Sequence, residues 1–433
     1  MYAKSISLTT TVQELRCGDA DLADYVDAIC DRVDTVNPAI AALLPESGRR
    51  ERLRAEARRL QEQFPSPADR PPLFMVPVGV KDLFRVDGFP TRAGSALPEG
   101  LFAGPQASVV TALQEAGALV VGKTQTDEFA HSEPSPARNP HALAHSPGGS
   151  SAGSAAGVAA GLFPLALGTQ TMRSVIGPAA FCGVIGFKPS YGRIPTDGVV
   201  FMSPSIDTVG FFTQDLDGIE LAAQILIPRW RSIGQLATPR LGVPECSILN
   251  QLTDEARAAF EAQLGRLAAT GFCVRRIQVL GDDEVARWFT TASNLLHAEM
   301  ATVHADWFAG YGELYRPRTA AAVRLGQTIS NRQLAAARVG QLRLRSSLED
   351  AMGQAGIDAW VVPSSNGPAP LGLEVTGWVD TTGLWSYAGM PCLSLPVVRA
   401  AGDLPLGLQL IAPHGQDEQL LAWASHVERR LTS

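Results

Sequence analysis

A long segment without charge in the middle of the chain restricts the fold more than any other feature. From Ser146 to Met172 there is no Asp, Glu, Lys or Arg, and Gly, Ala and Ser recur throughout. Serines and Pro164 divide this segment into pieces that are too short to cross a membrane. We expect a helix over 152–161 and an apolar strand over 162–167, both buried in a large soluble core with no membrane span. The small residues let such a helix approach its neighbours closely.

Short apolar segments alternate with helical patterns along the rest of the chain. Apolar runs at 73–80 and 118–121 flank a helical pattern over 109–116, and the alternation resumes beyond Asp207. Such alternation is typical of α/β proteins, in which helices cover both faces of a sheet. We find neither a flexible linker nor an internal repeat. The sequence therefore predicts an α/β fold in one large domain.

Composition restricts the partners of the protein. Lys+Arg total 36 against 43 Asp+Glu, which gives a formal net charge of −7. A large basic surface for nucleic acid is therefore not expected. The six cysteines stand singly without paired spacing, which predicts free thiols, no metal site and a cytoplasmic location. No secretory signal precedes the first helix. We expect a small molecule as the partner, and no cofactor.

Two short motifs match known patterns but lack the flanking structure that those patterns need. Residues 117–124 read GALVVGKT, a literal phosphate-loop pattern, yet the residues between the glycines are those of a strand. Residues 149–153 read GSSAG, the pattern of a nucleophile elbow, which needs a strand directly before it. Residues 131–148 carry four prolines instead of a strand pattern. His414 and His426 lie downstream, without a distinctive context for a triad histidine. Both interpretations are disfavoured.

A third pattern extends over much of the chain in ordered, separated segments. They are PVGVKD at 77–82, GKTQTDEF at 122–129, PGGSSAGSAAGVAAGLFPLALGTQT at 147–171, Ser174, PAAFCGVIGFKPSYGRIPTDG at 178–198 and SIDTVG at 205–210. Together they closely resemble the amidase signature family over about residues 70–215, and more weakly the N-terminal helices and 393–413. The branch that is most similar is that of small amidases with the pattern GTQT-x-G-SVIRPA.

The resemblance implies a single amidase domain over 1–433, with a mixed central β-sheet covered by helices on both faces. We divide it into N-terminal helices at 1–65, the signature core at 70–215, a variable, insert-like helical region at 210–350 and the C-terminal part of the core at 355–433.

Amide cleavage needs a nucleophile, a base and donors for the developing oxyanion. Lys81 ends an apolar segment, where burial would lower its pKa and make it a competent base. The resemblance implies that Lys81, Ser150 and Ser174 are the base, the bridging serine and the nucleophile, with a cis peptide bond at Ser150. It also implies an oxyanion hole made by the backbone N–H groups of Thr171, Met172, Arg173 and Ser174.

The chain departs from the family pattern beside the nucleophile. Met172 and Arg173 stand where glycine is usual, and Gly177 stands where the small-amidase branch carries an arginine that can bind a substrate carboxylate. Either Arg173 reaches the acyl pocket and pairs with a carboxylate or carbonyl, or it points into the protein and Gly177 opens the pocket to bulkier, uncharged substrates. We favour the second reading, with Met172 as a flexible apolar wall. These three are the candidate substrate-binding residues.

The predicted function is hydrolysis of a non-peptide carbon–nitrogen bond, in an amide, urea or carbamate, through an acyl-enzyme on Ser174. A small or aryl neutral substrate is expected, and the sequence is compatible with a homo-oligomer. The alternative is a non-catalytic or partner-dependent subunit with the amidase fold, as in tRNA-dependent amidotransferases. Gln170 replaces an aspartate that is common in the family, which counts against that role. Aromatic residues of the variable region are candidates for the pocket, with core packing as their default explanation: Trp288, Trp307, Trp378, Trp385 and Tyr387.

Overall fold

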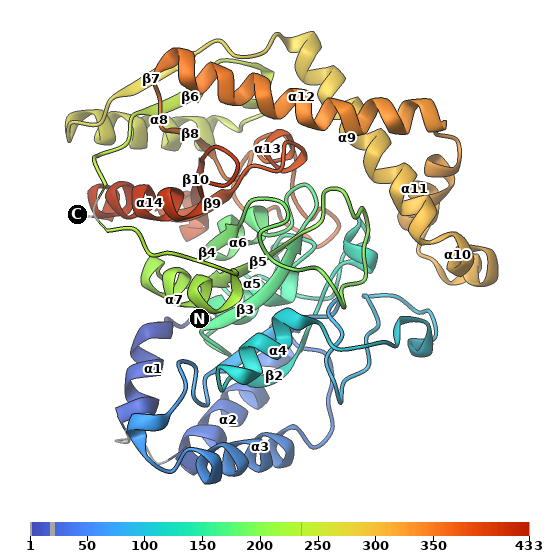
Figure 1. The fold of residues 1–433 in the computed structure, drawn as a ribbon, viewed down its shortest axis with the longest axis vertical. Helices are drawn as coiled ribbons and strands as arrows, with labels where there is room; N and C mark the ends of the chain where they lie inside the picture. The colour runs from blue at the N-terminus through green and yellow to red at the C-terminus, as the bar shows by residue number, and fades with distance from the viewer. Residues whose placement is uncertain (1, 18–21, 235, 433) are drawn as a thin grey trace.

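One mixed sheet runs through the middle of the protein in the computed structural model, which describes residues 2–17, 22–234 and 236–432 (Figure 1). Its strands are β1 Pro77–Lys81, β2 Leu119–Thr124, β3 Leu165–Gln170, β4 Ile185–Lys188, β5 Thr208–Thr213, β6 Leu241–Pro244, β7 Val274–Ile277, β8 Ala359–Pro363, β9 Cys392–Arg399 and β10 Pro405–Ile411. They lie in the order β2-β1-β3-β5-β4-β9-β10-β8-β6-β7. Strands β2, β1 and β3 are parallel, as are β8, β6 and β7, and antiparallel pairs join the two groups.

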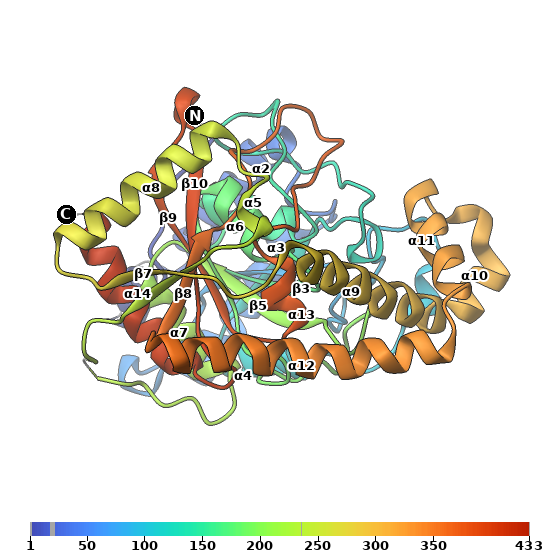
Figure 2. The same ribbon diagram turned by 90° about the horizontal axis from the view of Figure 1, so that it is seen from above.

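Helices pack on both faces of this sheet, as predicted. They are α1 Leu8–Cys17, α2 Leu22–Ile40, α3 Arg49–Gln63, α4 Ser108–Glu115, α5 Ala152–Ala159, α6 Ile176–Cys182, α7 Leu216–Leu226, α8 Asp254–Ala269, α9 Asp282–Val303, α10 Ala305–Tyr311, α11 Pro317–Gln327, α12 Asn331–Ala355, α13 Gly383–Tyr387 and α14 Asp417–Thr432. Helices α5 and α6 pack against one face, and α7 and α14 against the other. Helices α9 to α12 form an arm that extends from the body (Figures 1 and 2).

Alternation along the strands explains why both faces are covered. In β3, Leu165 and Leu167 belong to the larger apolar cluster, which includes residues of α7 and α14, whereas Ala166 belongs to the cluster around α5 and α6. Side chains of a strand point to opposite faces in turn, so a strand without polar residues must be buried on both. No helix in the described ranges has the length and apolar character that a membrane span needs.

The charged helix α3 covers the open edge of the sheet at β2. The guanidinium groups of Arg49 and Arg52 donate to the carbonyl oxygens of Val121 and Val120 at 3.1 and 2.9 Å. An uncovered edge strand exposes such groups to pairing with other chains. The two arginines therefore close part of this edge with their side chains, and the backbone of Leu43 and Leu44 pairs with β2 at Thr124 and Lys123.

Two predicted elements begin elsewhere in the structure. The apolar run at 73–80 is a strand only from Pro77, because Leu73–Val76 forms a buried turn in which Met75 has φ 57°. The run at 162–167 becomes a strand only at Leu165, after a turn in which Gly161 has φ 64°. A run of apolar residues indicates that a segment is buried, but it does not distinguish a buried turn from a buried strand.

The region at 210–350 does more than add helices. It supplies β6 and β7, which extend the main sheet at one end, in addition to the helical arm. The part of this region that stands apart from the sheet is the arm, α9 to α12 (Figure 2).

The small residues of α5 are required by close contacts with backbone. A β-carbon at Gly153 would lie 2.2 Å from the Ala42 carbonyl oxygen and 2.4 Å from the Gln125 nitrogen. Backbone atoms cannot move aside as the end of a flexible side chain can. The uncharged segment therefore contains a helix that packs closely between the sheet and the chain around Ala42, in accord with the prediction.

Gly153→Ala should destabilise the fold by about 1–3 kcal/mol or more, because the added methyl overpacks a rigid contact. The matched control is Gly265→Ala in α8, where a β-carbon would meet no atom within 4 Å. That variant should be stabilised by about 0.4–1 kcal/mol. Chemical denaturation midpoints of both variants test the account, and an equal effect of the two substitutions would contradict it.

Candidate active site

The candidate site lies at the edge of the sheet where three parallel strands end. Lys81 is the last residue of β1, and Thr169 lies near the end of β3 beside it. The loop over 131–151 returns to this edge and places Ser150 two residues before α5. The carboxyl ends of parallel strands are the usual place for a ligand in α/β proteins.

The Lys81 amino group lies among hydroxyl groups. Its Nζ is 2.8 Å from Ser150 Oγ, 3.0 Å from Ser151 Oγ and 2.8 Å from Thr169 Oγ1. The Ser151 hydroxyl donates to the Thr169 carbonyl oxygen at 3.1 Å, so its Oγ accepts from Lys81. An ammonium that loses a proton keeps two N–H donors and gains a lone pair. Those two donors match Ser151 and Thr169, which leaves the lone pair for the Ser150 hydroxyl.

Burial sets the charge of Lys81. The residue is 0% exposed, and desolvation lowers its pKa from 10.5 to about 7, against the opposing attraction of the Asp127 and Asp207 carboxylates. Burial also raises the pKa of Asp207 to about 6, although the Thr171 hydroxyl donates to this carboxylate at 2.5 Å. Lys81 can therefore lose its proton near neutral pH.

Ser150 and Ser174 line one cavity. The peptide bond between Gly149 and Ser150 is cis, as the family resemblance implies. The Ser151 N–H donates to the Ser174 carbonyl oxygen at 3.3 Å, which joins the two segments. Ser150 contacts Lys81, and no hydrogen bond between the Ser150 and Ser174 hydroxyl groups forms in the described chain. The structure thus brings Lys81 and Ser150 into contact and places Ser174 beside them.

Gln170 holds the turn that contains Ser174. Its Oε1 accepts from the N–H groups of Val175 and Ile176 at 2.7 and 2.9 Å, and its Nε2 donates to Ser386 Oγ at 2.8 Å. Gln170 is fully buried, so these bonds constrain both ends of the turn. No acceptor among the described residues contacts the backbone N–H groups of three consecutive residues in this turn, Met172, Arg173 and Ser174. These donors remain for a ligand.

The cavity has a volume of about 500 Å³ and a largely apolar wall. That volume is in the range of sites for small organic molecules. Its polar lining groups are Ser150, Arg173 and Ser174, together with His131, Ser132, Ser293 and His297. The apolar part of the wall comes from Ala130, Met172, Met202, Phe289, Leu296 and Val379.

Arg173 lines this cavity, and Gly177 does not. A β-carbon at Gly177 would lie 3.9 Å from the Arg173 β-carbon, so the stem of the arginine covers the glycine. The guanidinium donates to Thr376 Oγ1 at 2.6 Å. Its charge opposes the rise that burial causes in the pKa of Asp127. Gly177 therefore does not open the cavity, in contrast to the favoured sequence interpretation, because it is buried behind the Arg173 side chain in α6. Arg173 borders the cavity while its guanidinium bonds to Thr376, and its role toward a substrate stays a prediction.

The other candidate residues have structural roles. Lys123 of the phosphate-loop pattern lies in β2 and pairs with the buried Asp82 at 2.7 Å. His414 contacts the Tyr191 carbonyl oxygen, and His426 lies on α14 and is not part of the cavity wall. None of the five predicted pocket aromatics lines the cavity, where Phe289 is found instead.

Sequence reasoning missed His131 and His297 as well as Phe289. His131 comes two residues after the end of the GKTQTDEF segment, and this closeness to a family motif was the sequence feature that could have indicated it. His297 and Phe289 come from α9 in the variable region, where no motif marks them. Within the described residues, no group of three or more His, Cys, Asp or Glu side chains could hold a metal ion.

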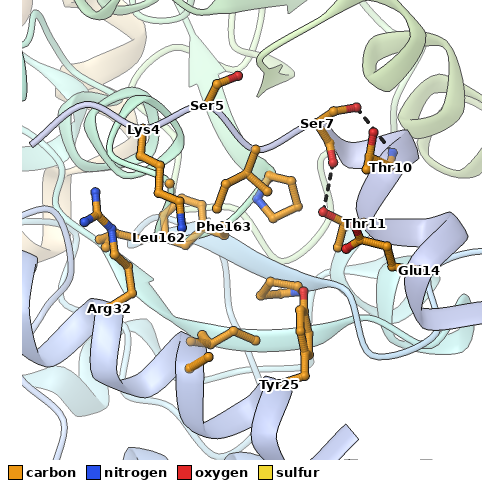
Figure 3. Close-up of a pocket in the computed structure, with 16 residues that line it drawn as sticks. Lys4, Ser5, Ser7, Thr10, Thr11, Glu14, Tyr25, Arg32, Leu162 and Phe163 are labelled. Carbon is orange, nitrogen blue, oxygen red and sulfur yellow. Dashed lines mark hydrogen bonds between the residues drawn. The ribbon is translucent and has the colours of Figure 1, made fainter. Parts of the chain in front are cut away.

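A second cavity, of about 370 Å³, lies beside the N-terminal segment and contains none of these residues (Figure 3). Figure 3 shows Ser7 bonded to Thr10 and Thr11 at the start of α1, with Tyr25 and Arg32 of α2 on the opposite wall. Arg32 donates to the carbonyl oxygens of Tyr2 and Ala160. These bonds hold the N-terminal segment against α2, so the groups that line this cavity serve the fold.

Comparison with known proteins agrees with this fold. The family model described as Amidase matches residues 24–421, so the chain belongs to the amidase family. It is 31% identical to a glutamyl-tRNA(Gln) amidotransferase subunit from Thermus thermophilus over 93% of each chain. It is 32% identical to the corresponding amidotransferase subunit from Deinococcus radiodurans over 82% of this chain and 84% of that one.

Solved structures show the same architecture. An amidase crystal structure superposes with a TM-score of 0.89 at 30% identity, over 98% of this chain and 100% of that chain. The peptide amidase of Stenotrophomonas maltophilia superposes with a TM-score of 0.83 at 22% identity, over 99% and 97% of the two chains, which supports the fold alone. The predicted α/β class and family membership are confirmed.

The kcat/KM of an amide substrate should rise with pH through about 7, because Lys81 accepts a proton only after losing its own and burial lowers its pKa to about 7. Lys81→Ala should lower kcat by about 1000-fold or more. Lys81→Arg should not restore it, since a guanidinium keeps its proton at usable pH. The control is Lys4→Ala, at an exposed lysine. A Lys81→Arg variant as active as the parent would contradict the role of Lys81 as a base.

Proposed function

We propose that the protein hydrolyses carbon–nitrogen bonds through an acyl-enzyme on Ser174, with Lys81 as the base acting through Ser150. The observation that carries this proposal is the buried Lys81 Nζ, 2.8 Å from Ser150 Oγ, at a cavity that Ser174 lines. Its pKa of about 7 makes an uncharged amine available near neutral pH. The proposed reaction uses no cofactor.

Each proton in this reaction has an assigned path. The Lys81 lone pair takes the Ser150 proton while Ser150 takes that of Ser174, and Ser174 Oγ attacks the carbonyl carbon. Free N–H groups of the turn at 171–174 stabilise the oxyanion. The protons return along the same path to the leaving nitrogen, which departs as an amine. Water, deprotonated by the same groups, then attacks the acyl carbon and releases Ser174.

A small or aryl neutral substrate suits this cavity best. Phe289, Leu296 and Met202 give it an apolar wall, and transfer of a charged group into such surroundings is costly. Arg173 already donates to Thr376 and lies in the field of Asp127, so part of its bonding capacity is used within the protein. The substrate can be an amide, a urea or a carbamate, and the branch of small amidases is the one that we favour. The free cysteines favour a cytoplasmic location.

Ser174→Ala should reduce amide hydrolysis by at least about 1000-fold, because the nucleophile is lost while the fold is kept. The test is steady-state turnover of a panel of simple and aryl amides. The control is Ser346→Ala, at an exposed serine of α12. Full activity in the Ser174→Ala variant would rule out the proposed mechanism.

A second candidate function is that of a partner-dependent subunit. The curated relatives named above are amidotransferase subunits, at 31% and 32% identity. This candidate predicts that the isolated chain reacts poorly with amides and gains activity with a partner. Labelling of Ser174 by an aryl fluorophosphonate in the isolated chain, detected as intact mass, would favour the hydrolase. Stable co-purification with other subunits, together with absence of labelling, would favour the partner-dependent role.

Arg173→Gly restores the residue that the family usually carries beside the nucleophile. If the guanidinium is compensated within the protein, kcat/KM for a neutral aryl amide should stay near the parent value or rise. If Arg173 recognises a substrate carboxylate, KM of a short carboxylated amide should instead rise by about 10- to 100-fold. Both substrates are measured on one preparation, with Arg343→Ala on the exposed face of α12 as the control. Collapse of neutral-amide turnover at unchanged thermal stability would contradict our preference.

A further inference from the structure

Two imidazole rings from different elements meet at the cavity wall. His131 belongs to the loop after the GKTQTDEF segment, and His297 to α9. Their ring centroids lie 6.0 Å apart at an interplanar angle of 67°. Both rings line the cavity that Ser150 and Ser174 line. The mechanism proposed above uses neither of them.

The hydrogen bond of His297 assigns its tautomer. Its Nδ1 lies 2.8 Å from the carbonyl oxygen of Ser293, one turn earlier in α9. The Ser293 hydroxyl oxygen lies 3.0 Å from the same nitrogen and can donate or accept. A carbonyl oxygen can only accept, so the shorter contact places the proton on Nδ1, and the hydroxyl then accepts as well. In a neutral ring the other nitrogen, Nε2, is then a hydrogen-bond acceptor. No partner for Nε2 is found among the described residues.

The surroundings keep both rings uncharged. Burial lowers the pKa of His297. It also lowers the pKa of His131 to about 4, with further contributions from His297 and Arg173. His297 therefore presents a neutral acceptor at neutral pH and attracts a donor, not an anion.

Helix α11 holds the two chain segments that carry these rings. Arg316 N and Arg318 N at the start of α11 donate to the carboxylates of Glu128 and Glu133, which flank His131. In addition, Gly326 of α11 packs against the His297 backbone so closely that a β-carbon there would lie 1.9 Å from its carbonyl oxygen. The helical arm thus holds the two rings at the cavity, as a site that selects a ligand must be held.

We propose that His297 Nε2 accepts a hydrogen bond from an N–H or O–H group of the substrate, beyond the carbonyl that is cleaved, and so selects substrates that carry such a donor. This inference rests on the proposed function for the identity of the substrate as an amide. The proposal narrows the expected substrates to uncharged amides that carry a hydrogen-bond donor on the acyl part or on the leaving group. His297 is a specificity-determining residue in this account, with His131 as its uncharged neighbour.

The test uses aryl amides with a hydroxyl group on the acyl ring or on the leaving-group ring, each paired with a methyl compound of similar shape. Binding is measured by calorimetry in the Ser174→Ala background, so that the result does not depend on turnover. One hydroxyl compound should bind more tightly than its methyl partner. Adding His297→Leu should weaken binding of that compound by roughly two- to tenfold, the worth of one neutral hydrogen bond, and leave the methyl partner unchanged. If the preferred hydroxyl is on the acyl ring, His297 lies on the acyl side of the cavity. If it is on the leaving-group ring, His297 lies on the leaving-group side.

Two further variants separate recognition from structure. His297→Gln keeps an acceptor and should keep the preference, whereas His426→Leu on α14 should have no effect. Equal loss for both members of each pair in the His297→Leu variant would mean that the ring only shapes the wall, and would overturn the proposal. The proposal would also be overturned if the Ser174→Ala protein that keeps His297 showed no preference for either hydroxyl compound. Failure of the proposed function has a different signature, namely full hydrolysis by Ser174→Ala, which is detected as product formation and does not depend on any hydroxyl preference.

Discussion

The burial of one lysine among hydroxyl groups is the constraint on which the site depends. Because burial lowers the pKa of Lys81 to about 7, the charged form costs on the order of 5 kcal/mol more in the folded protein than in the unfolded chain. The folded-state pKa lies below the unfolded one, so this cost is present in full below pH 7 and fades as the pH rises toward 10.5. The rest of the fold must offset it, and the extensive core on both faces of the sheet does so.

The same constraint explains why the central helix α5 carries no charged residue. Helix α5 is fully buried, and Ser154 on it bonds to the Leu167 carbonyl oxygen and to Thr124. A negatively charged side chain near Lys81 would return its pKa toward the ordinary value. Two carboxylates lie in its field. Asp207 accepts from Thr171 and from two backbone N–H groups, whereas Asp127 accepts from Ser135 N through Oδ1 and its Oδ2 has no hydrogen-bond partner among the described residues.

Sequence reasoning located the elements of the site that belong to long, ordered motifs. Lys81, Ser150 and Ser174 were predicted because their segments occur in the order and spacing of the amidase family, and the structure brings the first two into contact and places the third beside them. Their catalytic roles stay predictions. The direction of Arg173 was not predictable, because it depends on Thr376, 203 residues away along the chain. His297 carried no local signal, since only the packing of α9 against α11 brings it to the cavity.

The charge of Lys81 can be observed directly. The chain contains four lysines, at positions 4, 81, 123 and 188, so NMR of protein labelled with ¹³Cε-lysine gives few signals, and Lys81→Met assigns one of them. Our account predicts that the signal lost in Lys81→Met titrates near pH 7 in the parent protein. A Lys81 signal that stays protonated up to pH 10 would contradict the account, because such a lysine could not accept a proton from Ser150.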